Sequence, residues 1–155
     1  MLADIMTYVQ DNYKPQAMID LATLTGAILV ALGKEYAGLF SNNDSLSSQI
    51  MRACDAREEK SWRMPIGKPY HDMLKSHIAD MKHIGGPYGG SSSAACFLEK
   101  FVTNETPWAH LDIAGKAWSE KARPTVPTGG TGYGVRLLNK VIDDWQTPAK
   151  DASDN

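Results

Sequence analysis

Two short apolar segments that run directly into small residues constrain the fold of this chain most strongly. Residues 17–24 form an apolar run that contains Asp20, and residues 108–113 form a second one. The first run leads into Thr-Leu-Thr-Gly and the second into Ala-Gly. Small residues at the end of a strand let a ligand approach the backbone closely. Because ligands of open α/β sheets bind at the carboxyl ends of strands, the sequence predicts a binding site where these two segments end.

The rest of the chain alternates between helical and strand patterns, which predicts three-layer α/β architecture, αβα with a mixed central sheet. Thr25 is positioned to cap a short helix that Gly33 ends. The last helix, opened by Thr131, is expected to bury an apolar face of Val135, Leu138 and Ile142. The expected strands are 17–24, 36–40 and 108–113, and the expected helices are 2–13, 27–32, 45–58, 70–74, 91–102 with serine caps, and the one from 131.

The connecting segments divide into three kinds. Residues 60–88 are a loose segment that wraps the core. Residues 115–132 form a Pro/Gly-rich loop too long to be a simple connection, so we expect it to line a site or an interface. We expect residues 1–146 to form one domain, followed by a disordered tail at 147–155.

Composition excludes several classes of protein. A formal net charge of -2 over 155 residues gives no electrostatic reason to expect nucleic acid or an anionic membrane as a partner. Cys54 and Cys96 do not have the spacing of a disulfide framework or a zinc knuckle, and Cys96 fits a buried small hydrophobe. The sequence shows neither a signal peptide nor an apolar run near 18 residues, so a reducing cytoplasm fits best.

Local motifs for metal or nucleophilic catalysis are weak. The sequence contains no His-Glu-x-x-His and no Gly-x-Ser-x-Gly, and its acidic residues lack the spacing of a two-metal site. His110 alternates with apolar neighbours and is predicted to be a satisfied core histidine. Asp20 and Asp112 are strand acids that burial would pair with backbone or a basic side chain. The glycine-rich run 85–93 lacks the ending of a phosphate-binding loop, so helix capping is the simpler interpretation.

Several motifs occur in a fixed order along the chain: Leu2-Ala3-Asp4, Asp20 to Ala27, Trp62-Arg63-Met64-Pro65, Ile84-Gly85-Gly86, Ala94 to Leu98, Trp108 to Gly115 and Thr131-Gly132-Tyr133-Gly134. Together they resemble the C-terminal part of the catalytic domain of the leucyl aminopeptidases, the cytosolic two-metal exopeptidases. The resemblance covers roughly residues 2–146. It implies a partial version of that domain, whose full sheet is larger, so one strand is expected to present an unpaired edge.

The resemblance also implies roles for particular residues. The carbonyl of Leu24 and the amide of Gly26 would hydrogen-bond the main chain of a peptide substrate. Thr23, Ala114 and Ala117 would shape the pocket for its first side chain, with Leu-like preference. Relatives can carry Met where this chain has Ala117, which changes the expected depth of the pocket.

The family's metal-binding block, Asn-Thr-Asp-Ala-Glu-Gly-Arg-Leu, should end where this chain begins. Two divalent ions, Mn²⁺ or Zn²⁺, are implied for the complete protein. We expect this chain to contain no catalytic residue and no metal ligand, to bind no metal tightly by itself, and to be inactive alone.

Three functions remain as hypotheses. The first is part of an aminopeptidase acting on short peptides, assembled as a hexamer whose active sites face an internal cavity. The second is a non-catalytic assembly or binding module derived from the same fold. The third is an unrelated hydrolase with a site built from His77, His83 and nearby acids, which would require stoichiometric metal in the purified chain.

Overall fold

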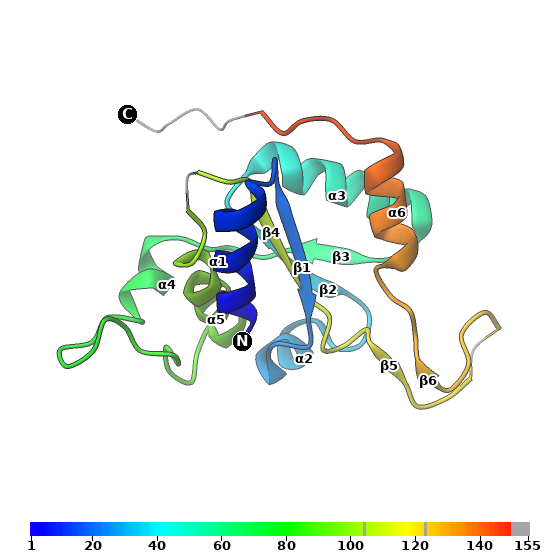
Figure 1. Ribbon diagram of the computed structural model, residues 1–155. Helices are drawn as coiled ribbons and strands as arrows, with labels where there is room; N and C mark the ends of the chain where they lie inside the picture. The colour runs from blue at the N-terminus through cyan, green and yellow to red at the C-terminus, as the bar shows by residue number, and fades with distance from the viewer. Residues whose placement is uncertain (104, 123, 150–155) are drawn as a thin grey trace.

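A mixed four-stranded sheet lies at the centre of the computed structural model, which describes residues 1–103, 105–122 and 124–149 (Figure 1). The strand order is β1-β4-β2-β3. Strand β1 is parallel to β4, β4 is antiparallel to β2, and β2 is parallel to β3. The bounds are β1 Met18–Ala22, β2 Ala37–Ser41, β3 Ser61–Arg63 and β4 Trp108–Asp112. The three strands expected from the sequence are confirmed, with ends that differ by one or two residues.

Strand β3 was not expected, because its three residues begin the segment that we predicted to wrap the core. It forms by pairing with the edge of β2. The amide of Ala37 donates to the carbonyl of Lys60 at 3.1 Å, and the amide of Met64 donates to the carbonyl of Leu39 at 2.8 Å. A strand this short is defined by its partner rather than by its own residue pattern.

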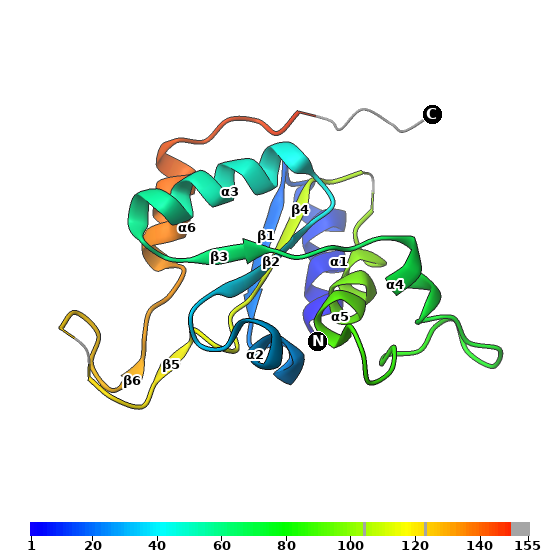
Figure 2. The ribbon, with the colours of Figure 1, turned by 180° about the vertical axis from the view of Figure 1, so that it is seen from behind.

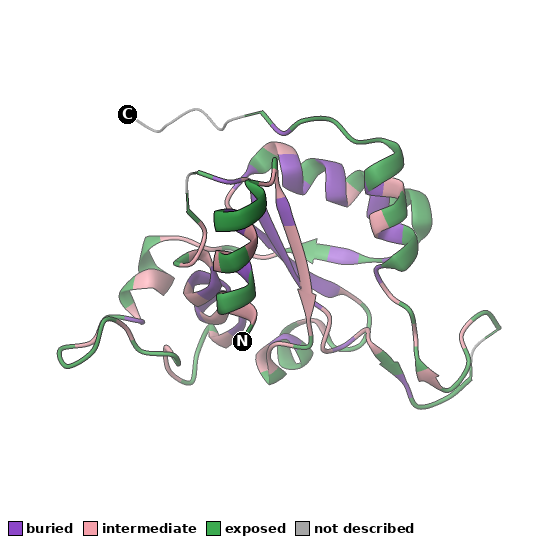
Figure 3. Ribbon diagram, viewed as in Figure 1, coloured by how far each residue is buried: buried purple, intermediate pink, exposed green. Residues whose placement is uncertain are grey.

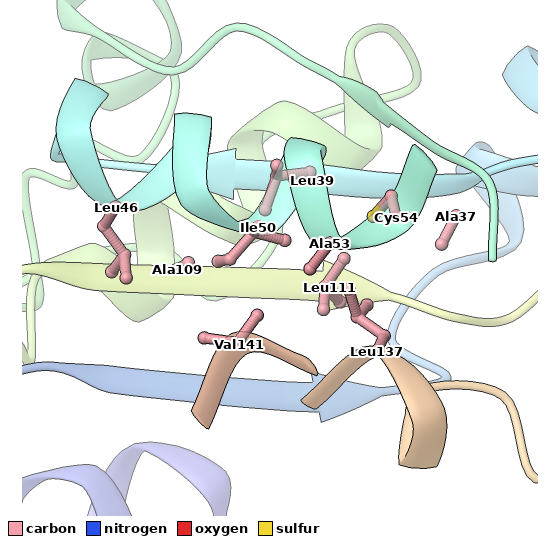
Figure 4. Close-up of a cluster of buried hydrophobic side chains, with 10 residues drawn as sticks. All are labelled: Ala37, Leu39, Leu46, Ile50, Ala53, Cys54, Ala109, Leu111, Leu137 and Val141. Atoms are coloured by element: carbon pink, nitrogen blue, oxygen red, sulfur yellow. The ribbon is translucent and has the colours of Figure 1, made fainter. Parts of the chain in front are cut away.

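One face of the sheet packs against α3 (Asp44–Arg57) and α6 (Val135–Asp143). Side chains at alternate strand positions point to the same face, so Leu39 and Leu111 meet the two helices there (Figure 4). The buried members of this cluster are Ala37, Leu39, Leu46, Ile50, Ala53, Cys54, Ala109, Leu111, Leu137 and Val141.

The opposite face packs against α1 (Leu2–Tyr13), α2 (Gly26–Leu32) and α5 (Gly90–Glu99). Trp108 and Phe40 are the largest buried side chains of this cluster. Its buried members are Met6, Met18, Ile28, Phe40, Ala95, Leu98 and Trp108. Helices therefore cover both faces, and the expected three-layer α/β architecture is confirmed (Figures 2 and 3). A shorter helix, α4 (Lys68–Asp72), packs beside α5.

The predicted start and buried face of the last helix are wrong. Helix α6 begins at Val135 rather than Thr131 because Gly134 precedes it in a left-handed conformation, with φ 96°. Val135 and Ile142 are 69% and 72% exposed, whereas Leu137 and Val141 are buried. The sequence offers two apolar rows with helical spacing. The buried Glu59 decides between them, because its carboxylate accepts hydrogen bonds from the amides of Gly134 and Leu137 at 3.3 and 2.8 Å.

Helix α5 also begins differently from the prediction. Its N-cap is Gly89 in a left-handed conformation, and no side chain caps it. The three serines that we expected as caps lie inside the helix and are buried. Small residues are needed there because the loop at Gly85 approaches closely: a Cβ on Gly85 would lie 2.8 Å from that of Ser93.

The segment expected to be a long loop carries a short antiparallel pair, β5 (Trp118–Ser119) and β6 (Gly129–Gly130), which projects from the body of the molecule (Figure 1). The expected tail falls only partly within the described residues, because residues 150–155 lie outside them. The side chain of Gln49 exchanges two hydrogen bonds with the backbone of Gln146, at 2.9 and 3.0 Å. Within the described residues, no helix has both the length and the apolar character needed to span a membrane.

Candidate functional site

The two sequence segments singled out above end side by side at one edge of the sheet. Because β1 and β4 are parallel, their carboxyl ends coincide, with Ala22 opposite Asp112. The amide of Ile113 donates to the carbonyl of Ala22 at 2.9 Å, which continues the pairing one residue further. The structure therefore brings the loop after β1 next to the turn after β4, as the residue pattern indicated.

A single buried carboxylate connects the loop and the turn. Asp112 is 1% exposed, and its Oδ1 accepts hydrogen bonds from the amides of Leu24 and Ala114 at 3.1 and 3.2 Å. Its Oδ2 accepts from the amide and the hydroxyl of Thr25 at 3.1 and 2.7 Å. The hydroxyl oxygen of Thr25 in turn accepts from the amide of Ile28 at 3.2 Å, which is the predicted cap of α2. The expected pairing of Asp112 with backbone is confirmed.

The loop after β1 leaves its candidate residues accessible. Thr23 and Gly26 are exposed, and Leu24 is half-buried. Gly26 is the first residue of α2, and no atom lies within 4 Å of the position that a Cβ would occupy there. Backbone groups in such open space can contact an extended ligand without selecting its side chains.

The turn after β4 packs closely against the end of α2. Gly115 is buried against α2: a Cβ on it would lie 2.2 Å from the carbonyl oxygen of Gly33. Ala114 and Ala117 are both half-buried. The backbone of Ala117 is occupied, since its amide donates to the carbonyl of Ile113 and its carbonyl accepts from the amide of Thr131. Ala117 therefore lies at the base of the β5–β6 pair, whereas Ala114 shares a hydrogen-bond acceptor with Leu24.

A cavity of 580 Å³ adjoins the loop after β1, between the start of α1, the loop at 83–86 and α5. Of the five candidate residues, only Leu24 lines it. Phe97 and Phe101 line its other wall, with ring centroids 5.2 Å apart. The cavity beside them depends on the path of the 83–86 loop, which no local pattern predicts.

A partly buried carboxylate, that of Asp20, organises the middle of the sheet. Asp20 accepts a hydrogen bond from the indole Nε1 of Trp108 at 2.7 Å, and its other oxygen lies 2.6 Å from Nδ1 of His110. His110 is fully buried and stacks on Phe40 and Trp108. Nε2 of His110 has no hydrogen-bond partner among the described residues. The prediction of a core histidine is confirmed, although only one of its two nitrogens is paired.

Potential metal ligands gather elsewhere in the chain. Within the described residues, the only group of three or more is His71, Cys96 and Glu99, between α4 and α5. His77 and His83, from the third hypothesis, are exposed and belong to no such group in the described part of the chain. At the carboxyl ends of β1 and β4, Asp112 is occupied by four donors.

Comparison with known proteins gives consistent matches. Residues 1–139 match the model of the cytosol aminopeptidase family, catalytic domain. A probable cytosol aminopeptidase of Caulobacter vibrioides is 57% identical over 144 residues, and one of Dinoroseobacter shibae is 54% identical over 143. Each match covers 92% of this chain and 29% of the relative, so the chain spans less than a third of their length.

Two solved structures share the fold. A mutant of the tomato leucine aminopeptidase superposes with a TM-score of 0.83 at 44% identity, over 90% of this chain and 26% of the other. The bottromycin maturation enzyme BotP superposes with a TM-score of 0.85 at 34% identity, over 91% of this chain and 31% of the other.

Proposed function

Because this chain belongs to the cytosol aminopeptidase family, we propose that it supplies one wall of the substrate cleft of a two-metal aminopeptidase that removes N-terminal residues from short peptides. The observation that carries the proposal is the pair of strand ends held together by Asp112. Because of this arrangement, the accessible loop at Thr23 to Gly26 and the turn at Ala114 lie next to each other at the carboxyl ends of β1 and β4.

In this proposal two divalent ions, Mn²⁺ or Zn²⁺, would supply polarisation of the scissile carbonyl and activation of a water molecule. Their ligands are assigned to the larger part of the relatives' length that this chain does not span. The proposal assigns no metal ligand to the strand ends, because the carboxylate of Asp112 already accepts hydrogen bonds from three backbone amides and from the hydroxyl of Thr25.

The described residues of this chain bind and orient the peptide. The carbonyl of Leu24 and the amide of Gly26 hold its main chain, which fixes its position without choosing its sequence. Thr23, Ala114 and Ala117 border the pocket for the first side chain and favour Leu-like residues. An apolar pocket of this kind discriminates by only about 1–3 kcal/mol, so the preference is broad.

The proposal extends to location and assembly. A cytoplasmic homo-oligomer, a hexamer by family resemblance, would enclose the active sites and admit only short peptides. The projecting β5–β6 pair, with Trp118 largely exposed, is the segment that we assign to a subunit contact or to the enclosed cavity.

Enlarging Ala114 tests its assignment to the pocket. In the complete protein, Ala114→Phe is expected to raise KM at least about 10-fold for a Leu-terminated dipeptide, because the ring fills space that the substrate side chain needs. The effect on a Gly-terminated dipeptide should be smaller. Val30→Phe places the same ring at an exposed position of α2 and should leave both values unchanged. An unaltered preference for Leu would remove Ala114 from the pocket.

Assay of residues 1–155 alone separates the enzyme proposal from its alternatives. We expect no hydrolysis of leucyl p-nitroanilide with excess Mn²⁺, and recovery of turnover when the remaining part of the protein is supplied. Metal-dependent turnover by the chain alone would show that the assignment of the metal ligands is wrong. Stable self-association in light scattering, without turnover even when the remaining part is supplied, would instead favour the non-catalytic module.

A further inference from the structure

We propose that His71, Cys96 and Glu99 form a binding site for one zinc-class divalent metal ion that joins α4 to α5. One histidine nitrogen, one cysteine sulfur and one carboxylate oxygen lie within 4.8 Å of one another. Each of these atom types is a common zinc ligand. The inference does not depend on the proposed peptidase activity, and it departs from the expectation that this chain alone contains no metal ligand and binds no metal tightly.

The local structure explains why the three side chains converge. Cys96 and Glu99 are three residues apart on α5, so they lie on the same face of the helix. His71 comes from the last turn of α4, which packs against α5. Nε2 of His71 is 2.7 Å from Oε2 of Glu99, so these two ligands already meet in a hydrogen bond.

The site has unused bonding capacity. Nδ1 of His71 is buried and has no hydrogen-bond partner in the described part of the chain. The Sγ of Cys96 is fully buried and reaches the carbonyl of Gly67 only across 3.9 Å. Buried polar atoms in folded proteins nearly always have a partner, and an unpaired one calls for an additional group at the site. A cation bound by this imidazole and thiolate supplies that group.

The ligand chemistry selects the class of metal. Thiolate and imidazole favour zinc and its soft neighbours over magnesium or calcium, which prefer oxygen ligands. On binding, the thiol of Cys96 releases its proton to solvent, while His71 coordinates the ion through a neutral ring nitrogen and Glu99 through its ionised carboxylate. Three protein ligands leave one tetrahedral position for water. Glu99 also lines an open hollow of 610 Å³, which gives the ion a route from solvent.

Binding would constrain the segment between the two helices. The chain from His71 to Cys96 includes the 83–86 loop that borders the cavity beside Leu24. A metal ion that ties the ends of this segment together reduces the freedom of the loop. The proposed role of the site is therefore structural: it holds the 83–86 loop, which forms part of the wall of that cavity.

Cobalt binding tests the proposal, because a Co²⁺–thiolate bond produces a charge-transfer absorption band in the near ultraviolet that carboxylate and imidazole ligands do not give. We expect the chain to bind one equivalent of Co²⁺ with this band, and Zn²⁺ to displace it. Cys96→Ala should abolish the band, and Glu99→Gln and His71→Gln should each weaken Co²⁺ binding at least about 10-fold. Cys54→Ala, which removes the other buried thiol, should bind as the wild type does.

Thermal unfolding gives a second readout. Zn²⁺ should raise the Tm of the wild type and of Cys54→Ala more than that of Cys96→Ala or Glu99→Gln, because the stabilisation grows with the affinity of the folded state for the ion. Glu99→Gln keeps the test decisive if Cys96→Ala fails to fold. Absence of the thiolate band in the wild type, or its persistence in Cys96→Ala, would overturn the proposal.

Discussion

Replacing Asp112 by alanine is expected to lower the free energy of unfolding by about 3 kcal/mol, because the change removes a buried carboxylate and leaves several partly buried donors without an acceptor. The amides of Leu24, Thr25 and Ala114 all lose their partner. Urea denaturation of the variant should show a lower midpoint with an unchanged slope. In the complete protein the same variant should lose activity while it is still folded, since both borders of the proposed cleft depend on this one carboxylate.

Asp72 supplies the matched control. Hydrogen bonds from Lys68 and Lys75 lower the pKa of Asp72 to about 2, but the carboxylate is exposed and solvent screens the interaction. We expect Asp72→Ala to leave the urea midpoint nearly unchanged. If Asp112→Ala were equally mild, the carboxylate would not be holding the loop and the turn together.

Replacing Gly115 by alanine is expected to cost about 2–3 kcal/mol of folding free energy, because the new Cβ would meet backbone rather than a movable side chain. The position it would occupy is 2.2 Å from the carbonyl oxygen of Gly33, which ends α2. Relief requires the turn after β4 or the end of α2 to move, and Ala114 would move with the turn. Thermal or urea denaturation measures the loss.

Gly130→Ala is the control for that substitution. It adds the same methyl group in β6, where no atom lies within 4 Å of the new Cβ. Its unfolding midpoint should match that of the wild type. Equal unfolding midpoints for Gly115→Ala and Gly130→Ala would contradict the close packing of the turn after β4 against α2.

The fold was predictable where a local pattern and the tertiary packing agree. The three longer strands are apolar runs bounded by polar or small residues, and they become three of the four strands of the sheet. The cap of α2 was predictable because Thr25 follows a strand and precedes an apolar helical segment. The structure confirms Thr25 as the N-cap, since its hydroxyl oxygen accepts a hydrogen bond from the amide of Ile28.

The fold could not be predicted where a contact with a residue far away in the sequence determines the local structure. Strand β3 exists because β2 offers it an edge. The rotation of α6 about its axis depends on Glu59, which lies 78 residues before Leu137 in the sequence. The carboxylate of Glu59 accepts a hydrogen bond from the backbone amide of Leu137, a core residue of α6. No spacing rule within the helix could choose between its two apolar rows.

The candidate site shows the same division. The sequence predicted that the two strand ends meet, because parallel strands share a carboxyl edge, and the structure confirms this. The roles of Thr23, Leu24, Gly26, Ala114 and Ala117 in substrate binding stay predictions. The cavity beside Leu24 and the cluster at His71 were missed, because both arise from the path of the segment between α4 and α5 rather than from a motif.

The position of β4 inside the sheet has a consequence for synthesis of the chain. Strands β1 and β2 are not neighbours, and each is hydrogen-bonded to β4, which is made much later. Ribosomes add about 5–20 residues per second, so the two early strands wait several seconds for the strand that joins them. During that interval the N–H and C=O groups that β4 will pair remain open to hydrogen bonding with other chains. Strands β1 and β2 can therefore join in one sheet only after β4 has been made.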